Sequence, residues 1–528
     1  MTFSPADSLV LFALLAAAAA LIVAAQATRI PYPILLVLGG LVLAFVPGIP
    51  AIQLPPDLVL VAVLPPLLYG TAFFTSLREF RANVKPISLL AVGLVLTTMV
   101  LVALAAHAVT DLSWAGSFVL GAIVSPTDPT AATAIAQRLG LPRTLVAVIE
   151  GESLVNDGTA LVAYKYAVGA VVAGSFSLVS ASWHFLLSVV GGIAIGVAVG
   201  FLIRQVRLRL ENPPVEITIS LLTGFFAYLP AQAAGVSGVL AAVAAGIYLG
   251  WHTLELTAAQ TRIQGISVWE ILFFLLNGLL FALVGLQLPQ ILDALSGRSA
   301  GSLVGYAALV FAVVVAARFL WILPGAYLSR IRRRDVLDGV SEEPWKGATV
   351  LAWSGMRGAV SLAAALALPL TTAAGAAFPN RDLIVFLTFA VILGTLVVQG
   401  LSLPALISAV QLHDDGTPDK EEAKARILAA EAALARLEEL VDEDWVREDT
   451  VERLRALFAF RSRRFRSRYA GEDDGAIETQ SLSYQRLLRE LLDAERAAVL
   501  DLQRSGRIDD DVMRRVVRDL DLEELRLN

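Results

Sequence analysis

A series of long apolar segments, filling the first 410 residues, constrains this chain more than any other feature. Hydrophobic residues make up 57% of its 528 positions and charged residues only 17%, against about 25% charged in soluble domains. A helix needs about 20 apolar residues to cross the hydrocarbon core of a bilayer. We therefore predict an all-α polytopic membrane protein with thirteen transmembrane helices, at residues 6–27, 31–47, 57–76, 86–109, 114–137, 144–172, 183–206, 215–231, 236–250, 266–288, 301–328, 347–370 and 383–410. The first is interpreted as a retained helix because no basic residue precedes Arg29.

The positive charges between these segments predict the orientation of the helices. Placing the N-terminus outside leaves only Arg298 and Arg381 in the outer loops, and fifteen basic residues fall in the cytoplasmic loops. Such an excess is typical of the cytoplasmic side. An odd number of helices then puts the C-terminus inside, so we predict a multi-pass protein of the inner membrane. The fifteen are Arg29, Arg78, Arg81, Lys85, Arg138, Arg143, Arg204, Arg207, Arg209, Arg262, Arg330, Arg332, Arg333, Arg334 and Lys346.

The composition changes near residue 410 and divides the chain into two predicted domains. Residues 1–410 form the transmembrane domain, and residues 411–528 form a charge-rich cytoplasmic tail of amphipathic helices. The tail contains a basic and aromatic run at residues 461–468 that could contact anionic lipid or nucleic acid. We interpret the run as a solvated or lipid-facing helix surface, and we expect no nucleic-acid partner.

Two of the predicted helices are interrupted. The fifth contains the sequence Ser-Pro-Thr-Asp-Pro at residues 125–129, whose prolines remove backbone donors. The twelfth contains Gly-Met-Arg-Gly at residues 355–358, whose glycines permit unwinding. The two positions are equivalent if two six-helix halves are related by inverted topology with the seventh helix as linker. Matched interruptions of this kind mark the binding site of many transporters. We therefore predict two unwound helices that cross.

Three carboxylates lie within eight residues of the sixth predicted helix, at Glu150, Glu152 and Asp157. Ionisable groups inside a bilayer are costly and mark ion pathways or paired networks. Residues four apart share a helix face, so Ser153 aligns with Asp157, and Glu152 aligns with Asn156. The two stripes are about 100° apart. Ser153 and Asp157 are thus predicted to share one ligand.

The residue types on this stripe favour a small monovalent cation such as Na⁺. Asp157, Ser153, Thr127 and carbonyl groups freed at the broken fifth helix supply oxygen ligands. Burial favours the protonated form of a carboxyl group, so Asp157 would hold either a proton or a cation. This competition predicts exchange without ATP and without a cofactor. An intramembrane hydrolase using Ser153 would need a histidine base in the neighbouring helices; none is present, so we do not predict an enzyme.

Asp128 and Arg357 lie at the two interruptions, where half-helix ends expose partial charges. We expect them to offset these charges; the alternative is a purely structural role. Arg357 stays protonated and needs an anion, for which Glu152 is the predicted partner. Arg318 is expected to pair locally. Glu270 and Asn277 are expected to join helices, with the lining of a funnel as the alternative.

Six motifs closely resemble those of the bacterial sodium/proton antiporters of monovalent cation:proton antiporter family 1, which are related to the animal sodium/hydrogen exchangers. They occur in family order over about residues 8–410. They are LPPLLY at 64–69, SPTDP at 125–129, ESLVND at 152–157, SGVLA at 237–241, WE with FLLNG at 269–278, and GMRGAV at 355–360.

The resemblance implies an inverted-repeat fold with a dimerisation part and a core part, a homodimer, and elevator-type transport. It implies a role in pH homeostasis in the bacterial inner membrane. It also implies that Asp157 carries the cation or proton, that Thr127 and Ser153 are ligands, and that Glu152, Arg357 and Asn156 support the site. The Asn156–Asp157 pair implies electroneutral one-for-one exchange. Two alternatives stay open: a K⁺/H⁺ antiporter with the same site, and a passive cation channel.

Overall fold

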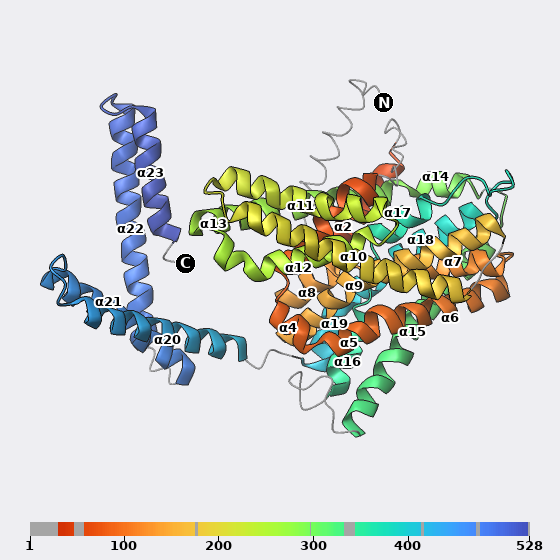
Figure 1. The fold of residues 1–528 in the computed structure, drawn as a ribbon, viewed down its shortest axis with the longest axis horizontal. Coiled ribbons are helices and arrows are strands. Elements are labelled where there is room, and N and C mark those ends of the chain that lie inside the picture. Colours follow the sequence, from red (N-terminus) through yellow and green to blue (C-terminus); the bar gives the residue numbers. More distant parts are fainter. Residues whose placement is uncertain are drawn as a thin grey trace. The chain divides into compact units, whose positions relative to one another are not determined.

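The computed structural model describes residues 30–46, 58–174, 178–295, 297–331, 344–412, 417–470 and 476–525. Within these ranges the regular secondary structure is helical, apart from a single β-bridge between Thr371 and Ala377. It divides into two compact units, Met1–Asp414 and Asp415–Asn528 (Figure 1). The predicted first helix at 6–27 lies outside the described residues, as do Arg29 and residues 332–334.

The helices of the first unit follow the predicted segments closely. They are α2 (Tyr32–Ala44), η1 (Leu58–Val63), α3 (Leu64–Phe74), α4 (Leu77–Ala82), α5 (Val84–Ser88), η2 (Leu89–Leu94), α6 (Val95–Val109), α7 (Trp114–Val124), α8 (Thr130–Arg138), α9 (Arg143–Ala173), α10 (Leu178–Arg207), α11 (Pro213–Ala233), α12 (Gly238–Leu256), α13 (Ala259–Leu286), α14 (Leu288–Asp293), α15 (Ala300–Ile331), α16 (Pro344–Trp353), α17 (Ala359–Leu366), α18 (Arg381–Gly394), η3 (Thr395–Gln399) and α19 (Gly400–Val410). The elements labelled η are π-helical turns that continue their neighbouring α-helices.

Seven helical segments among the described residues are long and apolar enough to cross a membrane, and three shorter apolar helices accompany them. α9 has 31 residues and is long enough as well, but it contains the carboxylates that the sequence singles out. The prediction of a polytopic all-α membrane protein is therefore confirmed. The count of thirteen helices and the inverted relation of the two halves stay predictions.

Both predicted interruptions are present. α7 ends at Val124 and α8 begins at Thr130, while α16 ends at Trp353 and α17 begins at Ala359. The two linking segments cross, because the Asp128 N–H donates a hydrogen bond of 2.8 Å to the Met356 carbonyl. Each linking segment thus satisfies a backbone group of the other segment that has no partner within a helix. The predicted crossing is confirmed.

Buried apolar side chains of the first unit form two clusters. The larger one includes side chains of α7, α9, α17 and α18, and it surrounds the crossing. The second lies on α3, α11 and α12, with Trp269 of α13 packed into it. The cation candidate Asp157 is in α9, which supplies residues to both clusters, so the site lies where the two groups of helices meet.

The second unit consists of α20 (Thr417–Leu440), α21 (Glu448–Ala470), α22 (Ala476–Arg504) and α23 (Asp510–Leu525). The basic run at 461–468 lies in α21, as predicted for a helix surface. Arg466 pairs with Glu431 of α20, and the guanidinium of Arg426 lies 5.0 Å from the ring centre of Phe465. Part of the basic run therefore packs against the preceding helix. The cytoplasmic location of this tail stays a prediction.

Ending the chain at Leu412 is expected to leave the first unit folded, because both of its apolar clusters lie entirely within that unit. The truncated protein should elute as a single symmetric peak in detergent and melt close to the temperature of the full chain. Aggregation of the truncated protein, with the full chain monodisperse under the same conditions, would show that the tail is needed for folding.

Candidate cation site

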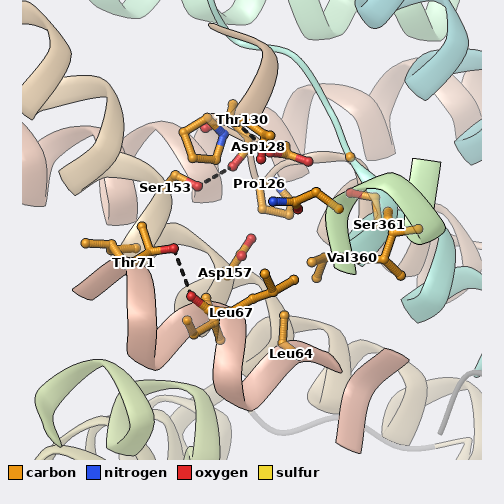
Figure 2. Close-up of a pocket in the computed structure, with 18 of the residues that line it drawn as sticks. Leu64, Leu67, Thr71, Pro126, Asp128, Thr130, Ser153, Asp157, Val360 and Ser361 are labelled. Carbon is orange, nitrogen blue, oxygen red and sulfur yellow. Dashed lines mark hydrogen bonds between the residues drawn. The ribbon is translucent and has the colours of Figure 1, made fainter. Parts of the chain in front are cut away.

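Asp157 lies in the middle of α9 and faces a cavity of about 90 Å³ (Figure 2). Walls of the cavity come from α3, the broken segment after α7, α13 and the start of α17. Because one water molecule needs only about 10–15 Å³ of such space, a cation with a few water molecules fits. The polar residues lining the cavity are Thr71, Thr127, Asp128, Thr130, Ser153, Asp157, Asn277 and Ser361.

The two stripes of α9 are separated as helical periodicity predicts. Ser153 and Asp157 both line the cavity. Glu152 and Asn156 are buried, 2% and 0% exposed, and neither lines it. A single turn of helix thus presents one carboxylate to the cavity and turns a second one into the protein interior.

Thr127 ties the broken segment to α9. Its carbonyl oxygen accepts a hydrogen bond of 2.8 Å from the Ser153 hydroxyl, and its own hydroxyl accepts one of 2.8 Å from the Asn156 amide. The Thr127 hydroxyl in turn donates to Glu152, at 3.3 Å. The Ser153 proton is therefore directed at Thr127, which leaves the lone pairs of the Ser153 oxygen available to a cation.

The Asp157 carboxylate is 8% exposed and accepts no hydrogen bond from the described residues. A buried carboxylate without donors is costly when ionised. Either a proton or a cation removes that cost. The cavity thus contains one acidic group whose charge the surrounding protein leaves uncompensated.

The second cavity carboxylate, Asp128, is placed differently. Its Oδ1 accepts the Thr130 N–H at 2.8 Å, at the start of α8. A Cβ added to Gly358, at the start of α17, would overlap the Asp128 carboxylate, so Asp128 lies against that helix start as well. Helix N-termini carry partial positive charge. This position agrees with the expected role of Asp128 in offsetting half-helix charge, at two helix starts. The role itself stays a prediction.

Arginines occupy the opposite ends of the broken helices. Arg357 Nε donates to the carbonyl of Val124, the last residue of α7, at 3.0 Å. Arg318 donates to the carbonyls of Leu351 and Ala352 in the last turn of α16, at 3.0 and 3.3 Å. Helix C-termini carry partial negative charge and unpaired carbonyls. The C-terminal ends of α7 and α16, the first halves of the two interrupted helices, are therefore each bound by an arginine side chain.

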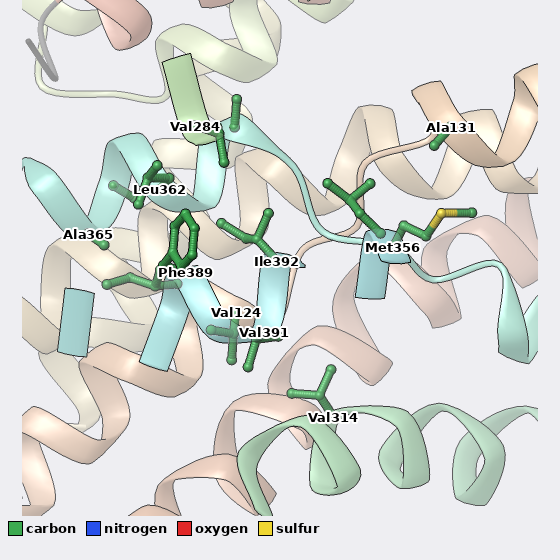
Figure 3. Close-up of a cluster of buried hydrophobic side chains, with 14 of the residues drawn as sticks. Val124, Ala131, Val284, Val314, Met356, Leu362, Ala365, Phe389, Val391 and Ile392 are labelled. Carbon is green, nitrogen blue, oxygen red and sulfur yellow. The ribbon is translucent and has the colours of Figure 1, made fainter. Parts of the chain in front are cut away.

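The surroundings of the crossing are apolar (Figure 3). Met356, Val391, Ile392 and Phe389 are buried, 1% exposed or less, and belong to the cluster that encloses it. Charges act more strongly on each other in such an environment than in water. The pairing of helix ends with charged side chains consequently matters more here than at a protein surface.

The predicted Glu152–Arg357 ion pair is wrong. Glu152 is bound instead by Arg318 of α15, which contacts both carboxylate oxygens; one of these hydrogen bonds is 3.0 Å long. The two side chains are only 3% and 2% exposed. Arg357 lies in the unwound segment itself, which brings it to the backbone carbonyls of Val124 and Gly355. A carboxylate on α9 is therefore left for Arg318.

The structure agrees with the alternative role given for Asn277 and not with the favoured one of joining helices. Asn277 lines the cavity with Asp157, while Glu270 is exposed on α13. The sequence did contain a signal for Arg318, since a single arginine in a long apolar helix implies a buried partner. For Asn277 the sequence left two roles open, joining helices or lining a funnel.

The chain is similar to a known protein family over most of its first unit. The profile of the family described as "Sodium/hydrogen exchanger, transmembrane" matches residues 10–409. The chain belongs to this family. An uncharacterized Na⁺/H⁺ exchanger of Mycobacterium tuberculosis is 36% identical to the present chain over 524 residues. The match covers 98% of the present chain and 96% of the mycobacterial protein.

Two further similarities extend the comparison. The sodium, potassium, lithium and rubidium/H⁺ antiporter of Bacillus subtilis is 35% identical over 388 residues, which cover 71% of this exchanger and 58% of that protein. The structure of the sodium proton antiporter of Methanocaldococcus jannaschii matches with a TM-score of 0.62 at 19% identity, over 78% of this exchanger and 98% of that chain. At that identity the match establishes the fold alone. The exchanger is a transporter and not an enzyme.

Changing Arg318 to Gln in the exchanger is expected to lower its stability by about 3–5 kcal/mol, because Glu152 is then left buried without its ion partner. The double variant R318Q/E152Q should recover part of this loss, since two neutral amides replace the unpaired charge. Thermal melting of the unmodified chain, R318Q, E152Q and the double variant in detergent measures the coupling between the two side chains. Additive losses, with R318Q no worse than R298Q at the half-buried outer arginine Arg298, would contradict a tight Glu152–Arg318 pair.

Proposed function

We propose that this chain is a secondary antiporter that exchanges H⁺ for Na⁺ by competition at Asp157. The proposal rests mainly on one observation: Asp157 is a buried carboxylate that lines a small polar cavity and accepts no hydrogen bond from the described residues. Thr127 and Ser153 line the same cavity and supply the further oxygen ligands that Na⁺ requires. Asn156, Glu152, Arg357 and Asp128 hold these groups in place.

The charge inventory of the site supports electroneutral exchange. The charge of Glu152 is balanced by Arg318, and Asp128 lies against two helix starts. Among the described carboxylates of the site, Asp157 alone has no compensating group. One bound Na⁺ or one bound proton therefore neutralises the site equally, and one replaces the other. A loaded site without net charge can move through the membrane interior at less cost than a charged one.

The fold supports a division into moving and static parts. One apolar cluster surrounds the crossing, and a separate cluster lies on α3, α11 and α12. We infer that the helices of the first cluster move as a core past those of the second, as an elevator, and that the second group forms the dimerisation part of a homodimer. We propose that the protein is located in the bacterial inner membrane, with its N-terminus outside and its C-terminus inside. Its proposed role is pH homeostasis.

K⁺ is a second candidate ion. The relative from Bacillus subtilis is named for sodium, potassium, lithium and rubidium. The ligands proposed here are oxygen atoms in a cavity of about 90 Å³, which sets no sharp limit on ion radius when water completes the coordination. Na⁺ stays the first proposal because the family is described by sodium/hydrogen exchange.

Changing Asp157 to Asn is expected to abolish exchange while leaving the protein folded, because an amide neither titrates nor carries the charge that binds a cation. Everted vesicles with a pH-sensitive dye provide the measurement: adding Na⁺ should dissipate the pH gradient for the unmodified chain and not for D157N. The matched control is Glu270→Gln, an acid-to-amide change at an exposed position of α13, which should retain exchange. Exchange by D157N at the level of the control would remove Asp157 from the mechanism.

Proteoliposomes with an imposed membrane voltage are expected to exchange Na⁺ for H⁺ at a rate that does not depend on the voltage, because one positive charge moves each way per cycle. Running the same assay with K⁺ and Li⁺ identifies the transported ion. A rate that rises or falls steeply with voltage would contradict one-for-one exchange. Current carried without counter-transport of protons would favour the passive channel.

A further inference from the structure

A second cavity, of about 360 Å³, lies away from the cation site and shares no lining residue with it. It is formed where the ends of α10 and α12 meet the starts of α11 and α13, together with the segment Phe73–Leu77. Nothing in the exchange mechanism uses this space.

Arg207, in the last turn of α10, lines this cavity. Its side chain is 3% exposed, and its Nε and Nη1 atoms have no hydrogen-bond partner among the described residues. A buried guanidinium keeps its proton and is strongly unfavourable without an anion. This contrasts with Arg318 and Arg357, which are equally buried but donate to carbonyls or to a carboxylate. Among the described residues Arg207 thus has no hydrogen-bond or close ion-pair partner, and Glu216 acts on it only through space.

The other charged groups at the cavity leave it positive. Arg262 is the second arginine in its wall and donates to the carbonyl of Thr257. Glu216 is buried nearby; one of its oxygens accepts a hydrogen bond of 3.4 Å from Thr261, and the other has no partner. No ion pair within 4.0 Å joins Glu216 to Arg207 in the described part of the chain. Two positive side chains and one negative side chain give a net charge of one positive unit, which one further negative charge would neutralise.

The rim of the cavity is apolar and open. Leu254 is 82% exposed, Trp251 52% and Ile266 47%, which is typical of side chains that face lipid. A neighbouring cavity of about 650 Å³ shares Leu77 and Trp251 as wall residues. Its other walls are largely apolar and include Phe185, Ile193, Val197 and Ile247. The anion site is thus adjacent to a space suited to a hydrocarbon chain.

The geometry points to a binding site for an acidic phospholipid, with its phosphate between Arg207 and Arg262 and an acyl chain in the adjacent apolar cavity. Arginine pairs favourably with phosphate oxygens through its fork of N–H donors. A small free anion would satisfy Arg207 but would leave the apolar cavity and the exposed rim unexplained. In the predicted orientation these arginines are at the cytoplasmic side, where the leaflet carries acidic lipids.

The test measures lipid binding to the full-length protein and does not involve transport, so its result is independent of the proposed exchange. The purified chain is delipidated in detergent and titrated with phosphatidylglycerol, with phosphatidylcholine, or with inorganic phosphate, while its melting temperature is followed. Phosphatidylglycerol should raise the melting temperature of the unmodified chain, and the other two should raise it little. Arg207→Gln should need about tenfold more phosphatidylglycerol for the same shift, as expected for losing a charged hydrogen bond.

The matched control is Arg209→Gln, which removes an exposed arginine two residues further on that does not line the cavity. It should respond to phosphatidylglycerol like the unmodified chain. Arg262→Gln provides an independent variant in the wall of the same cavity if Arg207→Gln does not fold. An equal response to both lipids, an equal response to inorganic phosphate, or a full response of both cavity variants to phosphatidylglycerol would overturn the proposal. The last result would mean that Arg207 acts only on Glu216.

Discussion

The crossing of two broken helices is the constraint on which the rest of this structure depends. Breaking a helix inside a membrane leaves N–H and C=O groups that water cannot satisfy. Here Asp128 lies against the starts of α8 and α17, Arg357 binds the end of α7, and Arg318 binds the end of α16. Three charged side chains thus serve four helix ends. These charges explain how unwound backbone persists in an apolar core.

The same arrangement determines which acidic group is left for an ion. Arg318 satisfies the end of α16 and also neutralises Glu152 on α9. Thr127 joins the broken segment to Ser153 and Asn156 on that helix. Asp157, one turn from Ser153, faces the cavity without a donor from the described residues. Asp157 is therefore the group left to bind an ion, because the neighbouring polar side chains are hydrogen-bonded within the crossing.

What the sequence predicted correctly depends on local rules. Proline removes a backbone donor wherever it stands in a helix, so the break at Ser125–Pro129 could be placed within a residue or two. The 3.6-residue period separated Ser153 and Asp157 from Glu152 and Asn156 before any fold was known. The partner of Glu152 was mispredicted because Arg318 and Arg357 are both single arginines in apolar helices. Which one reaches α9 depends on helix packing and on the path of the unwound chain. The role of Asn277 stayed open between two alternatives for the same reason, since facing a cavity is a property of tertiary structure.

The buried arginines of this chain are of two kinds, which differ in whether the fold supplies hydrogen-bond partners for the guanidinium. Arg318 and Arg357 are held by groups that the fold itself exposes, and their charge is needed wherever the helices break. Arg207 lies at the end of an unbroken helix, where no interruption exposes additional carbonyls beyond its own last turn, and its guanidinium makes no hydrogen bond to the described residues. A fold gains nothing from burying such a charge unless something else binds it, because a hydrophobic residue of similar size would be as stable or more so. The membrane supplies an abundant anion with an apolar body, and the combination of Arg207 with an adjacent apolar cavity matches both parts of that ligand.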